Sequence, residues 1–149
     1  GQDIFVRGII FGALHPLSSG TSHSAQYAVA GVLKAVNDGT YNYRNDVLEY
    51  GEKAKMMKDA FTSNGFKFTY DEDLGEPIAD GFYFTYYYPG MTGAELLEEM
   101  LYYGVSAISL DTCGSTRQGI RACTSLIQRD EIPVLAERVK RFAEDHPIK

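Results

Sequence analysis

Apolar residues recur at helical spacing in two long stretches of the chain, at about 43–64 and 132–145. Intervals of three and four residues place such positions on one side of a helix and leave the other side polar. The clearest example is the first stretch, whose apolar positions are Val47, Tyr50, Ala54, Met57 and Phe61. The pattern therefore predicts helices over these two ranges. A third helix is predicted at about 24–36, where the turn-forming run Asn37-Asp38-Gly39 ends it.

A fourth helix, over about 93–103, is predicted from the residues that begin it. Thr92 and Glu95 have the spacing of a capping box, and Gly104 supplies a natural stop. In the last helix we expect Asp130 to act as the N-terminal cap and Pro133 to be tolerated in the first turn.

Between the helices lie shorter stretches rich in β-branched and aromatic residues, each bounded by turn-forming residues. They predict strands, with polar loops at 12–23, 71–80 and 111–118. The five predicted strands are 4–11, 67–70, 82–88, 105–110 and 119–127.

From residue 66 onward the predicted order is strand, strand, helix, strand, strand, helix. This order is typical of an α+β domain in which a small mixed or antiparallel sheet carries its helices on one face. The predicted strand at 4–11 does not belong to that α+β unit, and we interpret it as the end of a larger structural unit. We therefore expect two domains, residues 1–40 and 41–149.

The charge, the apolar runs and the cysteines of the sequence exclude several classes of function. The net charge is −6 and no stretch is rich in Lys and Arg, which argues against nucleic acid and acidic membranes as partners. No apolar run reaches the roughly 18–20 residues that span a bilayer, and the cytoplasm is the expected location. Cys113 and Cys123 lack the spacing of a metal site, so we expect no bound metal and two reduced thiols.

Arg121 is the clearest chemical group, because it interrupts the small and apolar strand GIRACTSLI. A guanidinium in such a strand is costly unless it meets an anion. One interpretation is a structural ion pair with one of the twenty Asp and Glu side chains. The other is a ligand carboxylate, which the planar guanidinium holds through two parallel hydrogen bonds.

The run Ser18-Ser19-Gly20-Thr21-Ser22 precedes a predicted helix. Free backbone amides at a helix start can be capped by hydroxyls or can bind a phosphate. No Gly-Lys-Ser/Thr follows, so the run is not a nucleotide-binding P-loop, and spacing alone leaves both interpretations open.

The run DGFYFTYYYPGMTGAELLEEMLYYGVSAISLDTCGSTRQGIRACTSLI resembles the C-terminal small domain of class I/II pyridoxal-phosphate-dependent aminotransferases. The upstream run GIIFGALHPLSSGTSHSAQYAVAGVLKAV resembles the end of the large cofactor domain of that family. The resemblance implies the fold of the small domain of fold-type-I pyridoxal-phosphate enzymes. It also implies that Arg121 binds the substrate carboxylate.

The same resemblance implies a homodimer that acts on an amino acid and a 2-oxo acid. It further implies that a hydroxyl of Ser19 or Thr21 approaches the cofactor phosphate in the neighbouring subunit's site.

Family members need a lysine that binds the cofactor covalently, in a Ser/Thr-x-x-Lys or Ser-x-Lys setting. None of the seven lysines here has Ser or Thr one, two or three places before it. We therefore expect a C-terminal fragment whose cofactor-binding lysine lies upstream. By itself the chain should have no catalytic residue, bind no pyridoxal phosphate and be inactive.

Two alternatives stay open. The parent could be a pyridoxal-phosphate-dependent C–C or C–S lyase, because the small domain does not determine the reaction. The chain could also be a free-standing, non-enzymatic α+β module for ligand binding or dimerisation.

Overall fold

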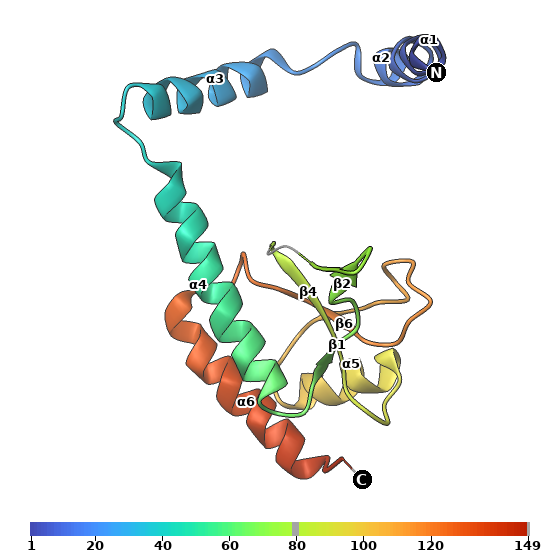
Figure 1. Ribbon diagram of the computed structural model, residues 1–149, viewed down its shortest axis with the longest axis vertical. Coiled ribbons are helices and arrows are strands. Elements are labelled where there is room, and N and C mark those ends of the chain that lie inside the picture. The colour runs from blue at the N-terminus through green and yellow to red at the C-terminus, as the bar shows by residue number, and fades with distance from the viewer. Residues whose placement is uncertain (79–80, 149) are drawn as a thin grey trace. The chain divides into compact units, whose positions relative to one another are not determined.

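The computed structural model describes residues 1–78 and 81–148 (Figure 1). The chain divides into two compact units, Gly1–Arg44 and Asn45–Lys149. The second unit carries the sheet and the buried core, and it contains Arg121.

The first unit is helical throughout its regular elements, which corrects the expectation of a strand at 4–11 and a loop at 12–23. Its elements are α1 (Gln2–Ile4), the π-helix η1 (Phe5–Leu14), α2 (His15–Ser18) and α3 (His23–Asn37). None of these elements contains a buried residue. A strand without neighbours leaves its backbone N–H and C=O groups unpaired, whereas a helix pairs them within the segment. Local pairing therefore wins over the β-preference of the apolar run.

Helix α3 confirms the prediction for residues 24–36. Ser22 caps it, its side-chain oxygen accepting the Ala25 N–H at 3.5 Å. The helix ends in a turn in which the Gly39 N–H donates to the Val36 carbonyl and Gly39 has φ +73°. Glycine reaches that left-handed conformation without strain.

The second unit has the expected α+β class, and its elements follow the predicted order apart from an additional hairpin, β2–β3. They are α4 (Tyr43–Thr62), β1 (Lys67–Phe68), β2 (Glu72–Asp73), β3 (Glu76–Pro77), β4 (Tyr83–Tyr87), α5 (Gly93–Tyr102), β5 (Ile108–Ser109), β6 (Ile120–Cys123), η2 (Arg129–Glu131) and α6 (Ile132–Asp145). The strands are shorter than predicted. The expected loop at 71–80 contains the β2–β3 hairpin, and its last two residues lie outside the described part of the chain.

One predicted helix start is confirmed and one is wrong. Thr92 and Glu95 form a reciprocal capping box at α5. Asp130 does not cap α6, which has no side-chain cap and is preceded by η2. Gln128 and Glu131 form a capping box at the start of η2. The helical segment therefore begins before Asp130, which cannot act as its cap.

The main sheet has the order β1-β4-β6-β5, and every neighbouring pair is antiparallel. Alternation along β4 and β6 buries one face and leaves the other half-exposed. The buried face packs against residues of α4, α5 and α6 in a single core cluster (Figure 1). Its members include Met57, Phe61, Phe84, Tyr86, Leu96, Met100, Ile120, Ala122, Val139 and Phe142.

Tyr86 and Tyr88 provide a matched test of this core. Tyr86 is fully buried, stacks on Phe61 at 4.5 Å, and its hydroxyl has no hydrogen-bond partner among the described residues. Burial raises the pKa of the Tyr86 phenol, which therefore stays neutral. The Tyr88 hydroxyl instead donates to the His146 carbonyl at 2.6 Å.

We expect Tyr86→Phe to raise the free energy of unfolding by about 1 kcal/mol, because it removes a buried polar atom that lacks a partner. Tyr88→Phe should lower it by about 1 kcal/mol, because it removes a hydrogen bond. Urea unfolding of both variants measures the two changes. An equal loss of stability in the two variants would contradict the assignment.

Candidate functional site

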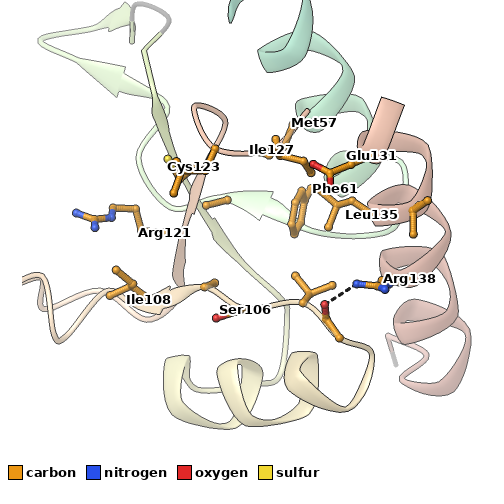
Figure 2. A pocket seen from close by; sticks show the side chains of 16 residues that line it. Met57, Phe61, Ser106, Ile108, Arg121, Cys123, Ile127, Glu131, Leu135 and Arg138 are labelled. Carbon is orange, nitrogen blue, oxygen red and sulfur yellow. Dashed lines mark hydrogen bonds between the residues drawn. The ribbon is translucent and has the colours of Figure 1, made fainter. Parts of the chain in front are cut away.

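Arg121 lies on the sheet face opposite the core. Its neighbours in β6, Ile120 and Ala122, are buried among the helices, so the side chain between them must leave from the other face. Figure 2 shows the Arg121 side chain pointing away from Met57, Phe61 and Leu135. The arginine is half-buried.

The Arg121 guanidinium packs on an aromatic ring. Its Cζ atom lies 4.5 Å from the centroid of the Tyr83 ring. Among the described residues, no hydrogen bond or ion pair to the Arg121 side chain is found. Directly across the sheet from Arg121 are Thr85 on β4 and Ile108 on β5. The structural ion pair that the sequence left open is therefore not formed within the described ranges 1–78 and 81–148.

Arg117, four residues earlier, is held differently. Its Cζ lies 4.7 Å from the Tyr70 ring centroid, and its Nη1 donates to the Thr69 carbonyl at 2.7 Å. The Tyr70 hydroxyl in turn is 2.6 Å from Ser115 Oγ. Arg117 therefore fastens the loop before β6 to the segment after β1, and this bonded role distinguishes it from Arg121.

Cys123 lies two residues beyond Arg121 on the same strand face. Its Sγ atom is 3.0 Å from Ser125 Oγ. Burial disfavours the thiolate, but hydrogen bonds from Ser125 and the charge of Arg121 outweigh it, and the pKa of Cys123 is lowered from its usual value. The thiol adds weak polarity beside the guanidinium, whereas Cys113 is exposed in a loop.

A cavity of about 600 Å³ lies on the other side of β6. Its walls are mainly apolar and include Met57, Phe61 and Leu135. Arg138 stands at its edge, with Nη1 donating to the Gly104 carbonyl at 2.7 Å. Arg121 also borders this cavity, but Figure 2 shows its guanidinium extending away from the other lining side chains. The cavity and the free end of Arg121 are therefore separate features.

Ser19 and Thr21 belong to the first unit, whereas Arg121 belongs to the second. Ser19 ends α2 in a left-handed conformation with φ +53°, and its N–H donates to the His15 carbonyl. Capping of α3 falls to Ser22. The side chains of Ser19 and Thr21 are both exposed in the loop between α2 and α3. The helix cap that the sequence suggested is therefore formed by neither of them but by Ser22.

The described lysines do not assemble a pyridoxal-phosphate site. Lys53 is the buried one, and its Nζ donates to the Ile127 carbonyl at 2.8 Å and lies 4.9 Å from the Tyr50 ring centroid. Lys34 and Lys140 pair with carboxylates on exposed helices. A lysine whose amine donates to a backbone carbonyl does not fit the role of the covalent cofactor ligand.

Neither a metal-binding cluster nor a helix able to span a membrane is present among the described residues. No group of three or more His, Cys, Asp and Glu side chains is arranged to hold a metal ion. Within residues 1–78 and 81–148, no helix combines the length and apolar character needed to cross a bilayer.

Sequence reasoning identified Arg121 but missed Tyr83. Strand alternation in the sequence could have shown that Tyr83 and Arg121 both point to the outward face of the sheet. It could not have shown that they are neighbours. The register Tyr83↔Cys123 and Thr85↔Arg121 makes Tyr83 a diagonal neighbour of the arginine, and a register cannot be read from two separate segments. Comparison of the chain with protein-family models and with curated proteins finds no match.

Proposed function

We propose that this chain is the C-terminal part of a pyridoxal-phosphate-dependent aminotransferase, which exchanges an amino group between an amino acid and a 2-oxo acid. The observation that carries the proposal is the Arg121 guanidinium, half-buried on a sheet face and without a carboxylate partner in the described residues. The resemblance of the surrounding run supplies the substrate class.

Arg121 suits a carboxylate because its donors lie in one plane and match the two oxygens of the ligand. An arginine side chain reaching out of a strand is also held more rigidly than one on a loop. In the proposal it binds the carboxylate shared by the amino acid and the oxo acid. It orients the reacting carbon and transfers no proton itself.

The cofactor would supply the electron sink for the reaction when bound. The buried Lys53 donates to the Ile127 carbonyl, so the proposal places the cofactor lysine and its acidic partner elsewhere in the polypeptide. A homodimer in the cytoplasm is part of the proposal, with Ser19 or Thr21 near the cofactor phosphate of a partner subunit. The exposed hydroxyls of this loop are consistent with such a contact.

Two rival functions can be separated by simple observations. A lyase of the same superfamily would release a fragment of the amino acid instead of transferring its amino group. A free-standing module would have no catalytic domain in the same reading frame. The gene sequence upstream of Gly1 decides the second case, since the proposal requires on the order of 200 further residues with a suitably placed lysine.

In the longer polypeptide, we expect Arg121→Lys to lower kcat/KM for the amino donor roughly 10- to 100-fold, mainly through KM. A point charge cannot reproduce the two parallel hydrogen bonds, each of which involves charged groups. Steady-state kinetics with an amino acid and a 2-oxo acid measures the change.

Arg117→Lys is the matched control, because Arg117 also packs on a tyrosine ring but donates to the Thr69 carbonyl. It should leave KM within about threefold of the unmodified protein. Unchanged kcat/KM in Arg121→Lys would refute the carboxylate role. Cleavage products in place of a new amino acid would assign the lyase reaction.

A further inference from the structure

We propose that Tyr83 is the positioning residue of the carboxylate anchor: its ring fixes the plane of the Arg121 guanidinium and leaves the hydrogen-bond donors free for the ligand. This inference rests on the proposed function, since it concerns how the same site presents Arg121 to a carboxylate. It adds a residue that the resemblance does not assign.

The contact follows from the sheet register. Thr85 is directly opposite Arg121, and Tyr83 is two residues away on the same face of β4. At this diagonal position a tyrosine ring can reach an arginine side chain on the neighbouring strand. The distance of 4.5 Å from Arg121 Cζ to the ring centroid is within the range of a cation–π contact.

Stacking holds the guanidinium without consuming its donors. The five N–H groups of arginine lie in the guanidinium plane, whereas an aromatic ring occupies the face of that plane. A structural hydrogen bond would take one edge of the guanidinium away from the ligand. The ring restricts the orientation and keeps both edges available for a carboxylate.

The residues opposite Arg121 on the two neighbouring strands also leave its hydrogen-bond donors available. Ile108 is opposite Arg121 on β5, and its side chain has no hydrogen-bond acceptor. The Thr85 hydroxyl oxygen accepts the Tyr70 N–H at 3.2 Å. Tyr83 is therefore the described side chain whose aromatic ring contacts the guanidinium.

Arg117 shows the contrasting arrangement within the same unit. Its stack on Tyr70 is accompanied by a hydrogen bond to the Thr69 carbonyl, so ring and carbonyl together fix it in the structure. For Arg121 the ring contact occurs alone. An arginine that only fastened two strands would gain stability from such a bond, and its absence among the described residues leaves Arg121 open to an external carboxylate.

The ring, and not its hydroxyl, is the part of Tyr83 that the proposal requires. Tyr83 is 54% exposed, so replacing it disturbs the core little. Tyr83→Phe keeps the aromatic face, and Tyr83→Leu removes it while keeping an apolar side chain. The two substitutions therefore separate the aromatic contact from general packing.

The first measurement uses nuclear magnetic resonance of the 149-residue chain. The Arg121 Nε–Hε signal is identified by its loss in Arg121→Lys. A guanidinium over a ring experiences the ring current, so the signal should be shifted upfield in the unmodified chain and in Tyr83→Phe. It should return towards the position of a free arginine in Tyr83→Leu. An unchanged signal in Tyr83→Leu would overturn the proposal.

The second measurement uses the longer polypeptide. Tyr83→Leu should raise KM for the amino acid and the oxo acid about three- to tenfold with kcat less affected, and Tyr83→Phe should restore KM. If Arg121→Lys impairs turnover and Tyr83→Leu does not, the positioning role is wrong and the proposed function stands.

Failure of the proposed function would give a different result from failure of the positioning role alone. If Arg121→Lys leaves turnover unchanged, the carboxylate role fails together with the positioning of a substrate by Tyr83. A ring-current shift that persists in that case would assign the Tyr83–Arg121 contact to the stability of the sheet. The two failures are thus told apart by kinetics, with the spectrum reporting the contact itself.

Discussion

Replacing Gly119 with alanine is expected to lower the free energy of unfolding by at least about 3 kcal/mol and to displace β6. Gly119 has φ +141°, a conformation that side chains with a Cβ rarely adopt. An added Cβ would lie 2.4 Å from the Tyr86 carbonyl oxygen and 2.7 Å from Thr69 Oγ1. The Gly119 carbonyl also accepts the Leu110 N–H, so a shift would break pairing next to Arg121.

Gly114→Ala is the matched control, because Gly114 also has a positive φ, +83°, but an added Cβ meets nothing within 4 Å. Its cost should be about 1 kcal/mol, from backbone conformation alone. Chemical unfolding followed by circular dichroism measures both variants. Equal losses for the two would show that the close approach at Gly119 does not limit the strand.

The helices of the second unit could be predicted because each carries its own signal. The apolar stripe of α4 and the capping box of Thr92 and Glu95 are local patterns, and both persist in the folded chain. The alternation in β4 and β6 is local as well. It places Arg121 on the face opposite Ile120, whatever the neighbouring strands are.

The first unit up to Ser18 could not be predicted in the same way, although α3 of that unit could. An apolar run such as Phe5–Leu14 has no helical or strand identity of its own, since β-preference depends on neighbouring strands. Among the described residues no strand pairs with it, and Ile4, Phe11 and Leu17 are exposed. The segment pairs its backbone within itself and becomes helical.

The candidate site was predictable in its chemistry but not in its surroundings. An arginine between small apolar residues signals an anion, because burial without one is unfavourable. Whether that anion is internal or external depends on residues distant in sequence. Tyr83 is thirty-eight positions before Arg121, and only the pairing of β4 with β6 brings the two together.

The chain by itself is expected neither to retain pyridoxal phosphate through dialysis nor to transfer amino groups. Retention requires a lysine that can bind the cofactor covalently, together with an acidic group near the pyridine nitrogen. The buried amine of Lys53 already donates to the Ile127 carbonyl. Exposed lysines such as Lys34 would condense with the aldehyde only weakly and without a surrounding site.

Arg121 alone is not expected to retain an amino-acid substrate. One charge-assisted contact is too little to hold a small amino acid, because association costs at least about 4 kcal/mol of lost translational and rotational freedom. The test is to mix the purified chain with the cofactor, dialyse it and record the visible spectrum. An amino donor and an oxo-acid acceptor are then added, with boiled protein as the control. Stoichiometric absorbance that is retained by the chain and lost in Lys53→Met would show that the catalytic lysine lies within these residues, contrary to the proposal.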